Sequence, residues 1–169
     1  IPIMMIAYDN APAAQRPVRW NMPRVLVLAS VLGILGVLAS FGLFWLVRDH
    51  LGLPPEIVQS AIFLKLLVSG HMTIYVTRTR GAVWERPWPS WKLIVPCELT
   101  QVLGTLAAVY GLFMAPIGWS LALMVWGYSL TFFAIACVVK LALCHHLDAW
   151  PRRHADHLAR IERHAGAQG

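Results

Sequence analysis

Residues 25–47 read VLVLASVLGILGVLASFGLFWLV, and this run contains no charged side chain. An α-helix needs roughly 20 apolar residues to cross the hydrocarbon core of a bilayer, so the run is long enough to span it. Three further apolar runs follow, at residues 57–76, 93–112 and 117–143. Of the 169 residues, 58% are hydrophobic and only 13% are charged, which lies outside the range of ordinary soluble domains. The sequence therefore predicts an all-α membrane protein with four transmembrane helices.

The part of the chain before these spans divides in two. The apolar run Ile1–Tyr8 is too short to cross a bilayer, and we interpret it as the end of a helix whose beginning is absent. Pro12, Pro17 and Pro23 interrupt helix formation, so we expect an extended link there. The expected organisation is the end of a helix at residues 1–10, a link at 11–24, a four-helix transmembrane region at 25–143 and a tail at 144–169.

Basic residues indicate on which side of the membrane each connection lies. The net charge is +6, and Arg and Lys concentrate before the first span, between the second and third spans, and after the fourth. The first loop carries Arg48 beside Asp49, and the loop at residues 113–116 carries no charge. Because cytoplasmic loops are rich in Arg and Lys, both ends and the second connection are predicted to face the cytoplasm. Basic residues that flank spans suit anionic lipid headgroups, and they do not form the continuous face that nucleic acid needs.

Four polar side chains inside the predicted spans are the candidate functional residues: Lys65, His71, Glu98 and Gln101. An unpaired ammonium near the middle of a span is costly, so Lys65 needs a function or a partner. The functional alternative is a fixed positive charge near a transport path. The structural alternative is an ion pair, with Glu98 the nearest candidate in sequence, or snorkelling toward water. His71, Gln101 and Gln59 can form hydrogen bonds between helices, and His71 can also serve in a proton relay because histidine as a residue type ordinarily exchanges protons near neutral pH.

Small residues in the first span favour helix packing. Ala29 and Gly33 are four residues apart, as are Gly36 and Ser40. This spacing places the small side chains on one side of a helix, which lets another helix approach closely. We therefore expect the first span to pack against a neighbouring helix through this side.

The cysteines and the histidines of the tail do not indicate a metal site. The cysteines form no CxxC pair, and we interpret them as packing residues: Cys97, Cys137 and Cys144. His164 would lie about 10 Å further along a helix than His154 and His157, too far to complete one metal site with them. We expect instead a helix at the membrane surface that begins near Pro151.

Several short strings stand in a characteristic order over residues 1–143: IAYDN (6–10), ASFGLF (39–44), QS (59–60), LKL (64–66), GH (70–71), VTRTRG (76–81), TQV (100–102), AVYG (108–111) and PIGW (116–119). In this order they resemble the C-terminal membrane region of the plasma-membrane proton-exporting (type III) P-type ATPases. The resemblance covers four spans, and the charge distribution gives the same orientation independently.

The resemblance implies that residues 1–10 end the sixth transmembrane helix of the family, and that the four spans are its seventh to tenth helices. In the family, ATP phosphorylates an aspartate in a cytoplasmic domain, and domain motion alternates access to a proton-binding carboxylate inside the membrane. The phosphorylation motif DKTG is not in this sequence. The proton-carrying aspartate is expected just before Ile1, so Asp9 matches the cytoplasmic end of that helix, where we expect a solvated carboxylate.

The resemblance therefore implies a supporting role in a proton-exporting translocase of the plasma membrane. The partners would be the transport helices and cytoplasmic domains of the pump, with ATP and Mg bound outside this chain. It implies no catalytic, cofactor-binding or metal-binding residue here. An independent four-helix scaffold or small carrier is the second hypothesis. An upstream reading frame that encodes DKTG would favour the pump, and stable expression of the four spans alone would favour the scaffold.

Overall fold

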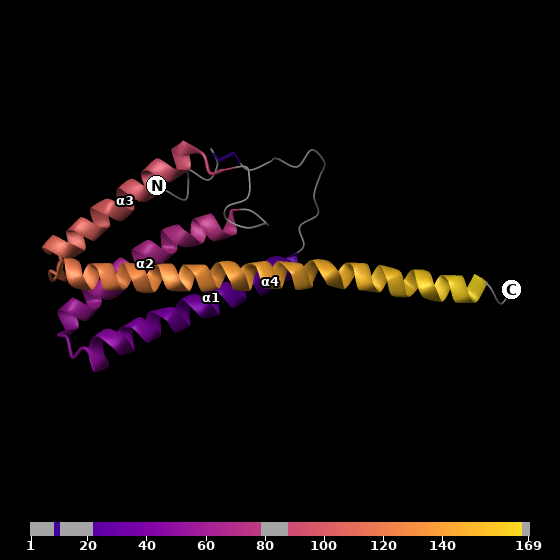
Figure 1. The fold of residues 1–169 in the computed structure, drawn as a ribbon, viewed down its shortest axis with the longest axis horizontal. Helices are drawn as coiled ribbons and strands as arrows, with labels where there is room; N and C mark the ends of the chain where they lie inside the picture. The colour runs from indigo at the N-terminus through magenta and orange to yellow at the C-terminus, as the bar shows by residue number, and fades with distance from the viewer. Residues whose placement is uncertain (1–8, 11–21, 79–87, 167–169) are drawn as a thin grey trace.

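The structure is a computed structural model that describes residues 9–10, 22–78 and 88–166, with side chains described up to residue 146. In these residues the chain forms four long helices: α1 (Met22–Trp45), α2 (Pro55–Thr77), α3 (Trp91–Tyr110) and α4 (Gly118–Gly166). One π-helical turn, η2 (Leu46–His50), extends α1. Consecutive helices run in alternate directions (Figure 1). All four are long and apolar enough to cross a membrane, which confirms the predicted all-α membrane fold.

The first helix begins earlier than predicted. α1 starts at Met22, and Pro23 lies in its first turn instead of ending an extended link. Proline is tolerated in this position because the first amides of a helix have no helical acceptor, and its fixed φ already suits a helix. The remainder of the predicted link, residues 11–21, lies outside the described residues, as does the run at residues 1–8.

Local chemistry explains the other helix ends. α2 begins at Pro55, directly after the extended Pro54, and Glu56 lies in its first turn, where a carboxylate meets the positive end of the helix dipole. α3 ends at Tyr110, and the next residue, Gly111, has a left-handed backbone (φ 78°) that favours glycine. The N–H of Leu112 donates to the carbonyl of Ala107 at 2.9 Å, and the N–H of Ile117 donates to the carbonyl of Ala108 at 3.0 Å, which provides a donor for one of the last carbonyls of α3.

The last helix is much longer than the membrane requires. α4 extends well past the other three helices toward the C-terminus (Figure 1). We expected a separate helix that begins near Pro151, and that expectation is wrong, because α4 continues through Pro151 to Gly166. A proline inside a helix removes one backbone hydrogen bond, and here the turns on both sides keep their helical conformation.

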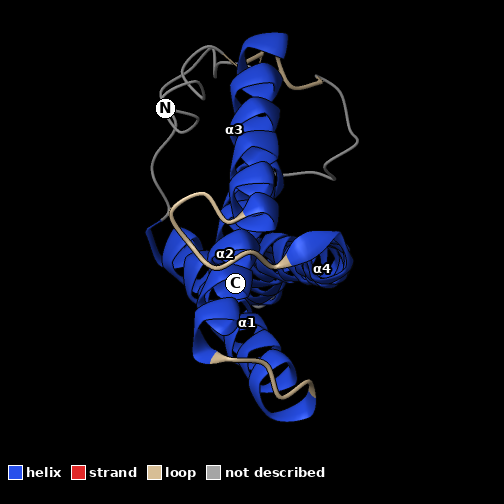
Figure 2. Ribbon diagram, turned by 90° about the vertical axis from the view of Figure 1, so that its left-hand side faces the viewer, coloured by secondary structure: helices blue, strands red, loops and turns tan. Residues whose placement is uncertain are grey.

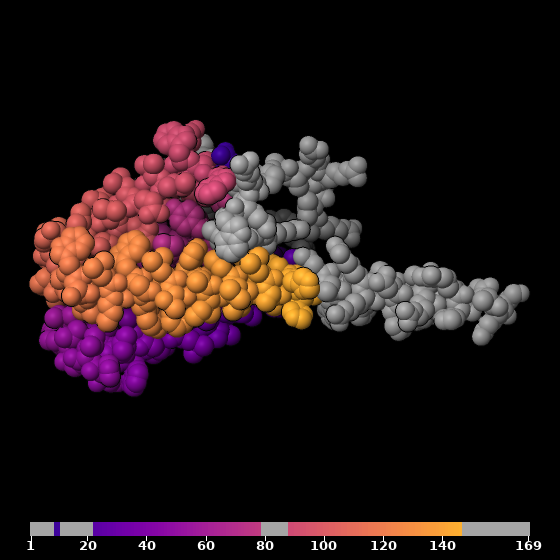
Figure 3. Space-filling model, viewed as in Figure 1, coloured from indigo at the N-terminus to yellow at the C-terminus, as the bar shows by residue number. Residues whose placement is uncertain are grey.

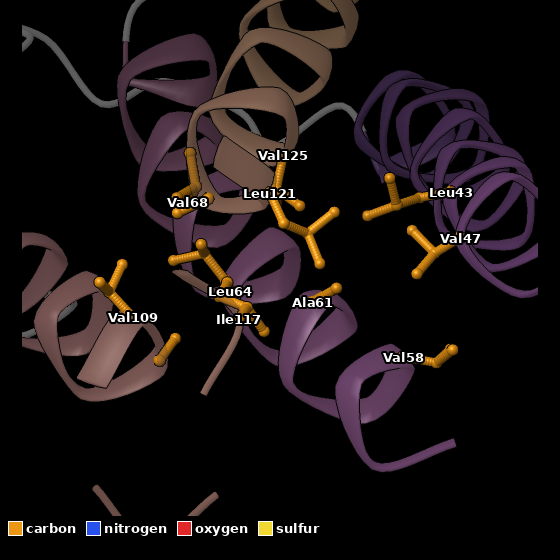
Figure 4. Close-up of a cluster of buried hydrophobic side chains, with 12 residues drawn as sticks. Leu43, Val47, Val58, Ala61, Leu64, Val68, Val109, Ile117, Leu121 and Val125 are labelled. Atoms are coloured by element: carbon orange, nitrogen blue, oxygen red, sulfur yellow. The ribbon is translucent and has the colours of Figure 1, made fainter. Parts of the chain in front are cut away.

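The hydrophobic core lies where α1, α2 and α4 meet, and Ala108 and Val109 of α3 join it. α2 is the central helix: it contacts α1, α3 and α4, and in the end-on view it lies between α1 and α3 (Figure 2). Leu43 and Val47 of the first span point toward Leu121 and Val125 of α4, with Ala61 of α2 beside them (Figure 4). These side chains are almost completely buried. The last turns of the first span are therefore held by both neighbouring helices.

The outer surface of the bundle is apolar, as a lipid environment requires. Large hydrophobic side chains are exposed on every helix, including Leu38 on α1 (62%) and Val138 on α4 (66%). Figure 3 shows α4 across the front of the bundle, between α3 and α1. In water so much exposed apolar surface would be a liability, whereas in a bilayer it faces lipid or other membrane helices.

Candidate functional site

Asp9 joins three separate parts of the chain in an arrangement that we call the Asp9 clasp (Asp9, Arg78 and Ser90). Its Oδ2 accepts a hydrogen bond from Arg78 Nε at 2.5 Å, and its Oδ1 accepts one from the backbone N–H of Ser90 at 3.0 Å. Arg78 directly follows α2, and Ser90 directly precedes α3. The side chains of Asp9 and Arg78 are only 1% and 3% exposed. The expected solvated carboxylate is therefore wrong, because Asp9 lies where the ends of α2 and α3 converge.

The clasp holds Asp9 in its ionised form. Burial alone would raise the pKa of the Asp9 carboxyl, since it disfavours the charged state. The hydrogen bond from Ser90 and the adjacent Arg78 guanidinium outweigh burial, and the pKa lies below its ordinary value. At neutral pH the clasp therefore contains an ion pair that connects Asp9 to the end of α2, and the hydrogen bond from Ser90 connects Asp9 to the start of α3.

Lys65 is bound by α1 and not by a carboxylate. Its Nζ donates to Ser40 Oγ at 2.7 Å and to the carbonyl of Gly36 at 3.2 Å, and Ser40 Oγ itself donates to the Gly36 carbonyl at 2.9 Å. Lys65 is only 2% exposed. The expected ion pair with Glu98 is not formed in the described residues, because Lys65 extends toward α1 whereas Glu98 lies on α3. Two neutral oxygens therefore hold the buried ammonium.

A cleft of about 410 Å³ lies beside Lys65, between α1, α2 and α4. Small residues of α1 form one wall, and Phe132 and Phe133 of α4 form part of another. A Cβ added at Gly33 or Gly36 would meet no atom within 4 Å. Gly33 and Gly36 of α1 thus border open space. The close helix packing that we expected from these small residues is not formed with α2 or α4.

His71 connects α2 to α3. Because a carbonyl can only accept, His71 Nδ1 donates to the Leu67 carbonyl at 2.7 Å. His71 Nε2 lies 2.9 Å from Thr100 Oγ1 on α3, and that hydroxyl also lies 2.8 Å from the carbonyl of Pro96. A neutral His71 accepts a hydrogen bond from the Thr100 hydroxyl. A protonated His71 instead donates a hydrogen bond to the Thr100 oxygen, while the hydroxyl donates to the Pro96 carbonyl. The geometry therefore satisfies both charge states of His71, which is compatible with the predicted hydrogen bond between helices and with a relay.

Glu98 also contacts α2. Its Oε1 accepts a hydrogen bond from the Tyr75 hydroxyl at 3.2 Å, and the carboxylate is exposed on the outer side of α3. Tyr75 lies four residues beyond His71, so both contacts belong to the same side of α2. The sequence did not indicate Tyr75, because a tyrosine near the end of a span is usually an interfacial anchor.

Gln101 lies inside the bundle without the hydrogen bonds that we expected. Its side chain is 0% exposed, and neither its amide nitrogen nor its amide oxygen has a partner in the described residues. Nearby, Trp126 Nε1 on α4 donates to Thr105 Oγ1 at 3.2 Å, and Thr105 donates to the backbone carbonyl of Gln101. The bond between α3 and α4 is thus made by Thr105 and Trp126, which sequence reasoning missed.

The cysteines and histidines give no metal site in the described part of the chain. All three cysteines are free and buried, as expected of packing residues: Cys97, Cys137 and Cys144. The side chains of His154, His157 and His164 lie outside the described residues.

These features define a multi-pass α-helical membrane protein whose helices are joined by buried polar contacts. The chain is 44% identical to a cation-transporting ATPase of Methanocaldococcus jannaschii over 147 residues, which is 87% of this chain and 18% of that protein. It is 32% identical to plasma membrane ATPase 2 of Schizosaccharomyces pombe (82% of this chain, 14% of that protein) and 31% identical to plasma membrane ATPase 2 of Saccharomyces cerevisiae (66% and 12%). No family model matches the chain.

The chain belongs to the P-type ATPase family of cation-transporting and plasma membrane ATPases. It spans less than a fifth of the length of these relatives. The membrane fold and the family agree with each other, since both describe an integral membrane protein with several spans.

Proposed function

We propose that this chain is the C-terminal membrane-domain part of an ATP-driven, proton-exporting P-type pump, in which it supports the transport helices. The observation that carries the proposal is the similarity to cation-transporting and plasma membrane ATPases over as much as 87% of the chain. The choice of the proton follows from the resemblance to proton exporters. ATP and Mg would bind to the cytoplasmic domains of the full-length pump, outside this chain.

The Asp9 clasp supports the idea of a supporting role. On the family resemblance, residues 1–10 continue a transport helix, so Asp9 lies where that helix leaves the membrane. Its contacts with Arg78 and Ser90 connect this position to the ends of α2 and α3. A transport helix that moves would then stay attached, through the Asp9 clasp, to the bundle that this chain forms.

The charge distribution supports a plasma-membrane orientation with both ends in the cytoplasm. In such an arrangement Asp9, the end of α2 and the start of α3 all lie on the cytoplasmic side. The remaining cytoplasmic domains of the pump would then be neighbours of the Asp9 clasp.

Substitutions in the intramembrane polar residues test whether the chain supports transport or performs it. In the full-length pump, we expect Lys65→Gln and His71→Asn to change ATP-driven proton transport per folded molecule by less than about twofold. The amount of folded pump, measured by size-exclusion chromatography, serves as the reference for each variant. Loss of transport with a normal amount of folded pump would mean that these residues belong to the transport site, and the supporting role would be wrong.

A further inference from the structure

One side of α3 forms a continuous apolar face with a single carboxylate in it, which we call the α3 outer face. It consists of Val95, Glu98, Leu99, Val102 and Leu103. These positions are three and four residues apart, so they lie on the same side of the helix. The four apolar members are between 50% and 56% exposed, and Glu98 is exposed as well. In the described bundle α3 packs mainly against α2 and α4, and it lies at the edge in the end-on view (Figure 2).

Glu98 lies well inside the membrane-spanning part of α3. The 20 residues of the helix extend for about 30 Å, close to the thickness of the hydrocarbon core. Glu98 is seven residues beyond Trp91, and therefore roughly 10 Å from the start of the helix. At such a depth a carboxylate that faces lipid is unfavourable, and intramembrane carboxylates generally face protein or a water-filled cavity.

The contacts described above satisfy this carboxylate only in part. Tyr75 donates one hydrogen bond to Oε1, whereas an ionised carboxylate can accept about four. The apolar residues around Glu98 resemble the surface that a helix buries against another helix. A face of this kind therefore fits a helix that offers a positively charged or N–H donor at the depth of Glu98.

We propose that the α3 outer face is the docking surface for a transmembrane helix outside residues 1–169, which donates a hydrogen bond or an ion pair to Glu98 from an Arg, Lys or amide side chain. The matched part of this chain covers only 18% of the M. jannaschii relative and 14% of a S. pombe relative, so additional helices are available in a full-length pump. This inference rests on the proposed function for the origin of that helix. It concerns assembly and not transport.

Photo-crosslinking identifies what covers the face. The full-length pump carries p-benzoylphenylalanine in place of Leu99, and a matched variant carries it in place of Leu38, an exposed leucine of α1. We expect the Leu99 variant to crosslink to a peptide outside residues 1–169 that contains an Arg, Lys, Asn or Gln. Crosslinks from position 99 only to lipid, or only to residues of this chain, would overturn the proposal.

A second measurement tests the donor to Glu98. In a Tyr75→Phe background, which removes the described partner, we compare Glu98 with Glu98→Leu in the full-length pump. If a helix outside the chain donates to Glu98, the Leu variant unfolds about tenfold faster in detergent at a fixed temperature, because the buried donor is left without its acceptor. An equal or slower rate would mean that Glu98 has no such partner. A pump that gave the expected crosslink and unfolding rate but exported no protons would refute the proposed function and leave the docking face in place.

Discussion

Removal of the Asp9 carboxylate should destabilise the protein much more than removal of an exposed carboxylate. The Asp9–Arg78 pair is only 1% and 3% exposed, and Asp9 also accepts the backbone hydrogen bond from Ser90. Breaking a buried ion pair on one side costs about 3–5 kcal/mol, because the remaining charge stays buried. We therefore expect Asp9→Ala to lower the free energy of unfolding by about 3 kcal/mol. Asp9→Asn should be less destabilising than Asp9→Ala, because the asparagine side chain can still accept the hydrogen bond from Ser90.

The same chain offers a matched control for this prediction. Arg48 and Asp49 form an ion pair at 3.8 Å with side chains that are 64% and 55% exposed. Solvent screens such a pair, so Asp49→Ala should cost less than about 0.5 kcal/mol. Unfolding of the full-length pump in mixed detergent micelles, followed by tryptophan fluorescence, measures both variants. If Asp9→Ala is no more destabilising than Asp49→Ala, the buried Asp9–Arg78 ion pair does not stabilise the fold, and the role assigned to the Asp9 clasp is wrong.

The pH dependence of the clasp follows from the pKa of Asp9, which is lowered in the folded protein. A lowered pKa means that the clasp contributes its full stability above the ordinary pKa of an aspartate. This contribution is lost as the pH falls through the lowered pKa that Asp9 has in the folded protein. The difference in stability between the parent and Asp9→Asn should therefore be constant between about pH 5 and 8 and decrease only in more acidic solution. A difference that changes across neutral pH would contradict the assignment.

Three further predictions concern the interior of the bundle. Because Lys65 and Glu98 bind different helices, the effects of Lys65→Gln and Glu98→Gln on the free energy of unfolding should add within about 0.5 kcal/mol in the double variant. A larger coupling energy would mean that Lys65 and Glu98 interact directly. Gln101→Leu should be neutral or stabilising, since it removes a buried amide without described partners, whereas a loss of more than about 2 kcal/mol would reveal a bound water or another partner. Gly104→Val should cost about 1–3 kcal/mol because a Cβ there overlaps a leucine of α2, while Gly70→Val, which faces open space, should cost much less in the same melting experiment.

The four helices could be predicted from the sequence because each span is a long apolar run. Their ends were less predictable: Pro23 is compatible with the first turn of a helix as well as with an extended link. Pro151 likewise did not end α4, since a proline lowers the stability of a helix but does not always interrupt it. The length of the apolar runs therefore identified the helices, and local residue preferences misplaced two of their boundaries.

The partners of the polar residues were harder to predict than their positions. Proximity in the sequence suggested Glu98 as the partner of Lys65, but the direction in which the lysine side chain leaves α2 decides the partner, and the side chain extends to Ser40 and Gly36. The Asp9–Arg78 contact joins residues 69 positions apart, and no periodic pattern encodes such a contact. The family resemblance located Asp9 at a helix end without indicating that it is buried.

A measurement of ATP-driven proton transport by the full-length pump is the most direct test of the proposal that this chain is part of a proton exporter. The protein that contains this chain is purified, reconstituted into liposomes with a pH-sensitive dye inside, and supplied with Mg-ATP outside. If this chain is part of a proton exporter, the liposome interior should acidify only when ATP is present, should still acidify when the other cations of the buffer are exchanged, and should lose its acidity on addition of a protonophore. ATP hydrolysis without acidification, or acidification that depends on another cation, would contradict the proposal that this chain is part of a proton exporter.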